Sequence, residues 1–313
     1  MKCLCCNKPL KTDSEIHDGW HQKCIRTFFG TNDIPSLSLD QKLLHDLADR
    51  TVNQGLTVPG VQKKLSLHLN QDAKGARFTL VDYPTGFILK PQSPDYTQLP
   101  EAEHLTMTMA RATGIFVVPF AMMECDGKFA YITKRIDRFA HAKLAMEDFC
   151  QLSGRSTSDK YKGSYEECGK IIKKYSGRSG LDLSELFLRL VFCNVTGNSD
   201  MHLKNFSLIE TERKSRNYVL SPAYDLLPVN VIMPADKEFS ALTLNGKKRN
   251  LRRNDFLALA ENMGLQKKAA IQIMESVLKK QTAYEKLIDE SYVTNDFKDQ
   301  FKYLMHQRMQ LLS

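Results

Sequence analysis

The hydrophobic pattern changes once along the chain, near Asp137, and this change constrains the fold more than any other feature. Before it, short apolar runs with polar neighbours are typical of strands. These expected strands are 65–69, 78–90, 116–123 and 128–136, with a hairpin signal at Asp126-Gly127. The expected helices of this part are 37–53 and 101–112.

After Asp137 the apolar residues follow the 3- and 4-residue spacing of amphipathic helices. The expected helices are 185–194 with Ser184 as N-cap, 255–263, 267–287 and 296–312. A strand-containing part followed by a helical part predicts an α+β fold with two lobes. We therefore predict a cysteine-rich segment at 1–36, an α/β lobe at 37–137 and a helical lobe at 138–313.

The charge balance bounds the class of partner. The 44 basic and 36 acidic residues give a net charge of +8, which suits nucleotides, nucleic acid or acidic protein surfaces. The basic run at 247–253 is either a solvated loop or a binding surface. Neither a membrane-spanning apolar run nor a secretory signal is present, so we expect a cytoplasmic protein without membrane contact.

Four of the eight cysteines fall within the first 24 residues. Cys3 and Cys6, then His21 and Cys24, form two ligand pairs that can close a tetrahedral Zn²⁺ site, with Cys5 and His17 as spare candidates. A segment this short buries little apolar surface, so a metal would help to order it. The alternative is a reduced, partly buried cysteine cluster under Trp20.

Residues 197–208 and 221–226 hold the densest group of side chains suited to chemistry. Asp200 and Asn205 have the spacing at which a kinase loop presents an aspartate to the attacking hydroxyl and turns an asparagine back toward Mg²⁺. Asp225 follows in an apolar frame, where a carboxylate can coordinate the same metal. This order favours phosphoryl transfer from ATP with Mg²⁺.

A kinase also needs a lysine that holds phosphate. Lys90 ends the apolar run 87–89, and Glu103 on the next expected helix is placed to pair with it. The loop 57–64 would cover the phosphates with backbone N–H groups and cations, although neither a GxGxxG nor a Walker A motif occurs. Each feature alone is common by chance, and it is their order along the chain that favours a kinase.

Five motifs resemble those of the HipA family of bacterial toxin-antitoxin kinases: GVQKKLSL, FILKP, MEDFCQLSGRSTSDKY, GNSDMHLKNFSL and SPAYDL. They occur in the family's order, and the resemblance covers roughly 55–313. It implies a two-lobed serine/threonine kinase fold that phosphorylates an aminoacyl-tRNA synthetase or another translation component and so arrests growth. It also implies a DNA-binding antitoxin of the HipB type, through which the kinase meets DNA only indirectly.

The resemblance assigns roles to individual residues. It implies that Asp200 is the catalytic base, that Asn205 and Asp225 hold Mg²⁺, and that Lys90 binds phosphate. His202 is expected mainly to pack and hydrogen-bond within the loop. The other candidates for contact with ATP come from four places. They are Glu103 on the expected helix 101–112; Thr57, Val58, Gly60 and Gln62 of the loop; Lys134, Arg135 and Ile136 of the hinge beside adenine; and, in the helical lobe, His202 and Tyr224.

The sequence departs from full-length HipA before the glycine-containing loop. The N-terminal subdomain of HipA is replaced by the cysteine-rich segment, a make-up similar to HipT of three-component HipB-HipS-HipT systems. This similarity implies a small antitoxin that supplies the missing subdomain. Thr57 occupies the position of the family's autophosphorylated serine and is a candidate for autophosphorylation, whereas Pro59 stands where HipT has a second serine.

Two other classes of function stay open at this point. One is a catalytically silent kinase-like subunit that acts with a DNA-binding antitoxin in operator repression. The intact set of Lys90, Asp200, Asn205 and Asp225 favours the enzyme over this alternative. The other is a zinc-dependent nucleic-acid binder, which the short length of the cysteine-rich segment disfavours.

Overall fold

The computed structural model describes residues 1–37, 64–72, 75–81, 85–125, 127–139 and 142–313. The chain divides into two compact units. Unit 1 consists of Met1–His104 and Val118–Arg138, and unit 2 consists of Leu105–Val117 and Phe139–Ser313.

This division differs from the expected domains at two places. Residues 105–117 belong to unit 2, because Thr113 is hydrogen-bonded to the Tyr284 hydroxyl at 2.6 Å and the Phe116 carbonyl accepts a bond from the Ala223 N–H. The cysteine-rich segment belongs to unit 1. The helix expected at 37–53 lies almost wholly outside the described residues.

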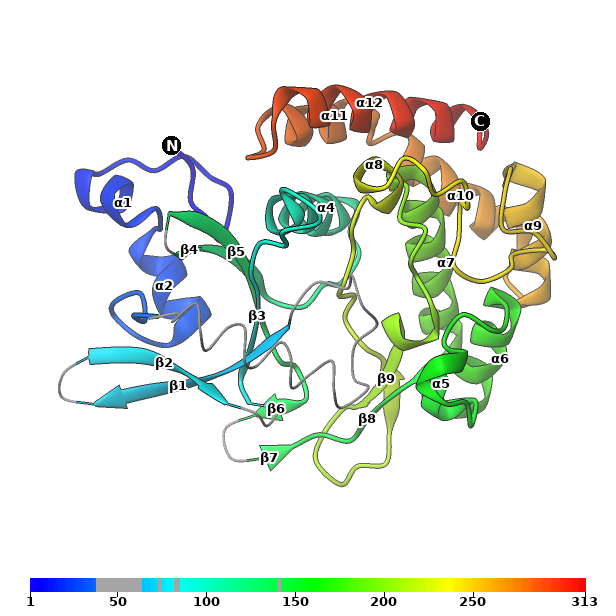
Figure 1. Ribbon diagram of the computed structural model, residues 1–313. Helices are drawn as coiled ribbons and strands as arrows, with labels where there is room; N and C mark the ends of the chain where they lie inside the picture. Colours follow the sequence, from blue (N-terminus) through cyan, green and yellow to red (C-terminus); the bar gives the residue numbers. More distant parts are fainter. Residues whose placement is uncertain (38–63, 73–74, 82–84, 126, 140–141) are drawn as a thin grey trace. The chain divides into compact units, whose positions relative to one another are not determined.

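Within the described residues of unit 1, five strands form an antiparallel sheet (Figure 1). Their order across the sheet is β2 (Gly75–Val81), β1 (Leu65–Asp72), β3 (Phe87–Lys90), β5 (Lys128–Lys134) and β4 (Phe120–Cys125). The single strand expected at 78–90 is in fact two strands. Leu67 of β1 lies opposite Leu80 of β2 on one side and Phe87 of β3 on the other, so the two ends of the run pair with opposite edges of β1.

The alternation expected at 65–69 is confirmed, because Leu65 and Leu67 are buried while His68 is exposed. The hairpin signal is confirmed as well. Cys125 of β4 pairs with Lys128 of β5, and Gly127 has a φ of 71°, a conformation that costs glycine little.

The cysteine-rich segment crosses the sheet of unit 1 from one edge strand to the other. The Leu4 carbonyl accepts a bond from the Met122 N–H of β4, while Ser36 bonds to β2 at the opposite edge. Two short helices lie between these points, α1 (Asp13–Asp18) and α2 (Gln22–Phe29). Phe28 and Phe29 of α2 are buried, with ring centroids 6.0 and 5.8 Å from those of Phe87 and Phe78.

The helix expected at 101–112 is confirmed as α4 (Leu99–Thr113), which stops before Gly114 at a φ of 100°. Nearly all of its residues are buried, including the polar residues Glu103 and His104. A helix that is buried on most sides needs internal partners for such polar groups.

Unit 2 is built around α7 (Ser179–Thr196), which packs against α6 (Tyr165–Tyr175), α10 (Lys267–Leu278) and α12 (Asn295–Gln310) (Figure 1).

The helix expected at 185–194 corresponds to α7, which begins earlier, at Ser179. Ser184 is not its N-cap: it lies inside the helix, and its hydroxyl donates to the Gly180 carbonyl. The extension is stabilised by Asp182, whose carboxylate binds the Arg178 side chain and the Leu220 N–H.

The helix expected at 267–287 is in fact two helices, α10 and α11 (Gln281–Asp289). The break lets α10 pack on α7, while Tyr284 of α11 contacts Phe192 with ring centroids 6.2 Å apart. The helix expected at 255–263 is confirmed as α9 (Arg253–Asn262), and the one at 296–312 as α12.

The remaining elements are short: β6 (Arg138–Phe139), β7 (Ala142–Lys143), β8 (Met146–Asp148), α5 (Phe149–Leu152), η1 (Thr157–Asp159), η2 (Leu203–Asn205), β9 (Ser207–Glu210), β10 (Tyr218–Leu220) and α8 (Val229–Ile232). In unit 2, β9 lies between β8 and β10. Among the described helices none is both long and apolar enough to cross a bilayer.

Candidate functional site

Lys90 and Glu103 form a buried ion pair in unit 1. Lys90 is the last residue of β3, and its Nζ donates to Oε1 of Glu103 on α4 at 2.5 Å. Lys90 is 4% exposed and Glu103 is fully buried, and the Lys90 ammonium also lies 5.3 Å from the centre of the Tyr131 ring. The predicted pair is thus present, and it holds the ammonium group in one position at the strand end.

The loop residues Thr57, Val58, Gly60 and Gln62, which were predicted to cover the phosphates, lie outside the described residues. Their contact with ATP stays a prediction, as does the autophosphorylation of Thr57.

The expected hinge at Lys134–Ile136 is engaged in the packing of unit 1. The Lys134 ammonium lies 5.8 Å from the ring centres of both Phe28 and Phe87, and burial lowers the pKa of Lys134. Arg135 binds Asp137 through two parallel hydrogen bonds of 2.9 Å. These contacts hold the segment firmly, while its role beside adenine stays a prediction.

Asp200 lies in a loop of unit 2 that begins where α7 ends, at Gly197 with a φ of 69°. The Asp200 carboxylate accepts a hydrogen bond of 2.8 Å from the Tyr161 hydroxyl. Its backbone carbonyl accepts bonds from the His202 N–H at 2.8 Å and from Nδ2 of Asn205 at 2.9 Å. The asparagine therefore turns back onto the aspartate, as the spacing predicts.

This bond decides which atom of Asn205 can face a metal. Because Nδ2 donates to the Asp200 carbonyl, the amide presents Oδ1 as its coordinating atom. Asp225 supplies carboxylate oxygens in the same unit, and oxygen atoms of these two kinds are ligands that Mg²⁺ accepts. The residues present therefore fit the ion that the resemblance implies.

Asp225 has a backbone conformation that is uncommon among non-glycine residues. Its φ is 62°, in the left-handed region, while Leu226 next to it is fully buried. Strain of this kind persists only where the surroundings impose it, and it is concentrated at functional sites. The neighbouring backbone is held in unit 2 by the bond from the Ala223 N–H to the Phe116 carbonyl.

Tyr224 connects this segment to the Asp200 loop. Its hydroxyl lies 2.6 Å from the Ser207 hydroxyl and donates to the Lys204 carbonyl at 3.1 Å, and burial raises its pKa. The resemblance implies an aromatic beside adenine, whereas the contacts present in unit 2 tie Tyr224 to the loop.

Two other residues of the loop are engaged within unit 2. His202 is buried and packs edge-on against Tyr161 with ring centroids 5.0 Å apart, in line with its predicted packing role. Lys204 donates to the carboxylate of Asp148 at 2.8 Å, which holds its ammonium beside the start of α5.

A buried polar network under the loop was not predicted from the sequence. Ser199, next to Asp200, donates to Asp236 at 2.6 Å, and the Asn230 amide donates to the Ser199 hydroxyl at 3.3 Å. The Asn230 carbonyl oxygen accepts a bond of 2.9 Å from Arg308 of α12, whose pKa burial lowers to about 10. No local sequence signal marks these residues, because up to 78 positions separate the partners.

We expect the substitution Asn230→Ala to lower the free energy of unfolding by about 1–3 kcal/mol, because it removes the buried oxygen that accepts the hydrogen bond from Arg308. Chemical denaturation measures this change. The exposed Asn262→Ala is the matched control and should stay within about 0.5 kcal/mol of wild type. Equal effects from the two substitutions would contradict a structural role for the network.

Several basic side chains of the run at 247–253 are engaged within unit 2. Lys247 donates to Asp255 at 2.7 Å, and the Lys248 ammonium lies 3.7 Å from the Glu238 carboxylate. Arg253 donates to the Leu312 carbonyl at 2.9 Å. These contacts give a structural use to Lys247, Lys248 and Arg253.

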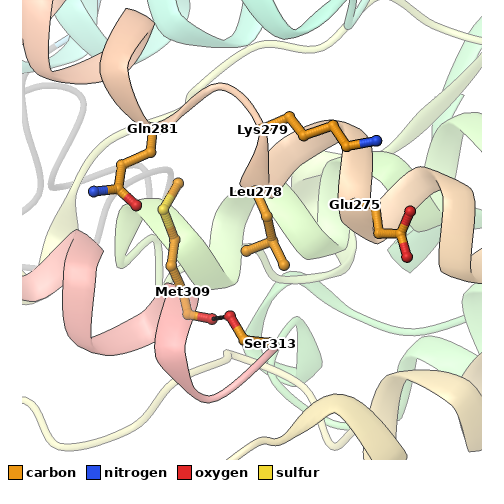
Figure 2. Close-up of a pocket in the computed structure, with 6 residues that line it drawn as sticks. All are labelled: Glu275, Leu278, Lys279, Gln281, Met309 and Ser313. Carbon is orange, nitrogen blue, oxygen red and sulfur yellow. Dashed lines mark hydrogen bonds between the residues drawn. The ribbon is translucent and has the colours of Figure 1, made fainter.

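A pocket lies near the C-terminus in unit 2. Figure 2 shows the residues that line it, with a hydrogen bond of 3.0 Å from the Ser313 hydroxyl to the Met309 carbonyl. Its lining is Glu275, Leu278, Lys279, Gln281, Met309 and Ser313. None of the predicted catalytic residues is among them.

The four residues of the predicted zinc site come together in unit 1. The ligand atoms of Cys3, Cys6, His21 and Cys24 all lie within 4.8 Å of one another.

Two solved structures have a fold similar to that of this chain. The HipA chain in a complex of HipA, HipB and operator DNA from Shewanella oneidensis superposes with a TM-score of 0.67 at 20% identity, over 82% of this chain and 64% of that chain. CtkA, a proinflammatory kinase of Helicobacter pylori, gives 0.56 at 15% identity, over 78% and 93% of the two chains. The predicted α+β kinase-like fold is thereby confirmed.

Relatives in sequence lead to the same family. Y4dM of Sinorhizobium fredii is 38% identical over 55% of this chain, which spans only 44% of that protein. A Haemophilus influenzae protein is 28% identical over 83% of this chain and 82% of that protein. Y4dM and the Haemophilus influenzae protein both carry provisional kinase names. The serine/threonine-protein kinase toxin HipA of Shewanella oneidensis is 26% identical over 56% of this chain and 44% of that protein. Because the profile of the HipA-like C-terminal domain matches residues 56–284, well over half of the sequence, this chain belongs to the HipA-like kinase family.

Proposed function

We propose that this chain is an ATP- and Mg²⁺-dependent serine/threonine protein kinase. The observation that carries the proposal is the bond from Asn205 Nδ2 to the Asp200 carbonyl, which turns the Asn205 oxygen outward as a metal ligand and involves only the backbone of Asp200. The buried Lys90–Glu103 pair in unit 1 supports it, because kinases use such a pair to hold phosphate.

In this mechanism Asp200 accepts the proton of the attacking serine or threonine hydroxyl. The hydroxyl oxygen forms a bond to the γ-phosphorus while the bond between this phosphorus and the β–γ bridging oxygen breaks, and ADP leaves. Lys90 holds phosphate charge, and Asn205 and Asp225 hold the metal. When bound, Mg²⁺ neutralises charge on the phosphate oxygens. Positioning and charge thus provide most of the acceleration.

We further propose the role of a toxin within a toxin-antitoxin system. The Shewanella oneidensis structure is a complex of HipA with HipB and operator DNA, and this supports a HipB-like partner that contacts DNA for the present chain. A small antitoxin as a second partner and an aminoacyl-tRNA synthetase as substrate follow from the resemblance. Phosphorylated proteins recovered from cells after induction would identify the substrate.

The direct test of the kinase proposal uses the purified full chain with γ-labelled ATP and a bacterial extract. We expect label on serine or threonine of an extract protein, and thermal stabilisation by ATP only when Mg²⁺ is present. Stabilisation without labelling would favour the silent regulatory subunit instead. A chain that gains no stability with Mg²⁺ and ATP would contradict both readings of the site.

A further inference from the structure

The four side chains of the N-terminal cluster are spaced as ligands of a single small ion. His21 Nδ1 lies 3.3 Å from the Cys6 sulfur and 3.9 Å from the Cys24 sulfur, and all four ligand atoms lie within 4.8 Å of one another. Around a tetrahedral Zn²⁺, thiolate and imidazole ligands are about 3.5–3.8 Å apart. The cluster is close to this spacing, so little movement is needed to close it around the metal.

The backbone between Cys3 and Cys6 is folded into a tight turn. The Asn7 N–H donates to the Cys3 carbonyl at 2.9 Å, and Asn7 has a φ of 59°, which asparagine tolerates better than most residues. The Cys3 N–H donates to the Lys8 carbonyl, and the His21 N–H donates to the Cys3 sulfur at 3.5 Å. This turn directs the thiols of Cys3 and Cys6 to one side, and the bond from the His21 N–H ties the Cys3 sulfur to the start of α2.

The other two ligands lie at the start of α2. His21 is the N-cap residue and Cys24 is in the first turn of the helix. His21 Nε2 lies 3.0 Å from the Pro9 carbonyl, which assigns the ring proton to Nε2 and leaves the Nδ1 lone pair directed at the sulfurs. Metal-bound histidines commonly donate their second ring nitrogen in this way.

The alternative of a reduced cysteine cluster under Trp20 fits less well. Trp20 is buried, but its ring packs on Phe28 and Phe29, with centroids 5.8 and 5.1 Å away. Cys6 and Cys24 are only half-buried, whereas free cysteines that merely fill a core are usually among the most buried residues.

We propose that Cys3, Cys6, His21 and Cys24 bind one structural Zn²⁺. Three sulfur ligands and one imidazole form a closed tetrahedral set, which is typical of structural rather than catalytic zinc. The site is independent of the proposed kinase chemistry, since none of its ligands takes part in it.

The ion would hold the N-terminal segment on the sheet of unit 1. Leu4, between two ligands in the sequence, bonds to the edge strand β4, and α2 places Phe28 and Phe29 on the strands β2 and β3. Loss of zinc is therefore expected to release this cover from the sheet. Trp20 is the one tryptophan of the sequence and is 1% exposed, so its fluorescence reports on this segment alone.

The test is metal analysis of the full chain, purified without a metal-affinity step from cells grown with zinc. We expect about one Zn²⁺ per chain in wild type and in the matched control Cys5→Ser, and less than about a tenth of that in Cys24→Ser. A chelator should remove the ion and shift the Trp20 emission to longer wavelength, and added Zn²⁺ should reverse the shift. Wild-type protein without zinc, or Cys24→Ser with undiminished zinc, would overturn the proposal.

Two further measurements keep the proposal testable if Cys24→Ser does not fold. Wild-type protein reconstituted with Co²⁺ should show the absorption of a tetrahedral site with sulfur ligands. Cys24→His should retain the metal with a changed cobalt spectrum, because histidine is also a zinc ligand. An octahedral cobalt spectrum in the wild type would contradict the assigned ligand set.

Discussion

Replacing Asp200 by asparagine is expected to lower phosphoryl transfer by about 10²- to 10⁴-fold, the usual contribution of a general base. Binding of Mg²⁺ and ATP should be retained. The Tyr161 hydroxyl can still donate to Oδ1 of the new side chain, and the contact with Asn205 involves only the backbone carbonyl. Asp200→Asn thus removes the proton acceptor and keeps the loop.

Single-turnover labelling with γ-labelled ATP measures the loss, and thermal stabilisation by Mg²⁺ and ATP measures binding. Asp296→Asn, an exposed position on α12, is the matched control and should leave transfer unchanged. If the chain is a toxin, induced expression of Asp200→Asn should no longer arrest growth. Transfer at the wild-type rate would refute the assignment of Asp200 as base.

The substitution Glu103→Leu is expected to lower the free energy of unfolding by about 3–5 kcal/mol, because it leaves the buried Lys90 ammonium without its carboxylate. The double substitution Lys90→Met with Glu103→Leu should recover much of that loss, since apolar side chains of similar volume then fill the site. Chemical denaturation of the three proteins measures both steps. A surface pair provides the control, as Lys302→Met beside Asp289 should change stability by about 1 kcal/mol or less.

The same double variant separates structure from function. If Lys90 holds phosphate, the protein with recovered stability should still show no stabilisation by Mg²⁺ and ATP. Wild-type stabilisation by the nucleotide in the double variant would show that the pair only supports the packing of β3 and α4.

The candidate catalytic residues could be predicted from the sequence because their geometry is largely local. Asp200 and Asn205 are five positions apart, and one short loop with a 3₁₀ turn brings the amide of one to the carbonyl of the other. Lys90 and Glu103 are 13 positions apart, on a strand and the helix that follows it. The Cys3–Cys6 and His21–Cys24 pairs are local as well, in a turn and at a helix start.

The errors in the predicted elements share a different cause. Periodicity alone predicted one helix over 267–287, but α10 packs on α7 whereas α11 places Tyr284 against Phe192. Likewise Ser184 is inside α7, because the buried Asp182 stabilises a longer helix through contacts with distant backbone. In both cases a tertiary contact overrides the local signal.

The sequence by itself determined the class of fold, the family and the catalytic and metal-ligand candidates, because strand and helix periods and short motif spacings are encoded by neighbouring residues. Only the tertiary structure decided which contacts fix these residues in place and which unit each segment joins. Tyr161 reaches Asp200 across 39 positions, Arg308 reaches Asn230 across 78, and residues 105–117 join unit 2. Such contacts form only when packing excludes water from paired polar groups far apart in the chain, and no local pattern records which pairs will meet.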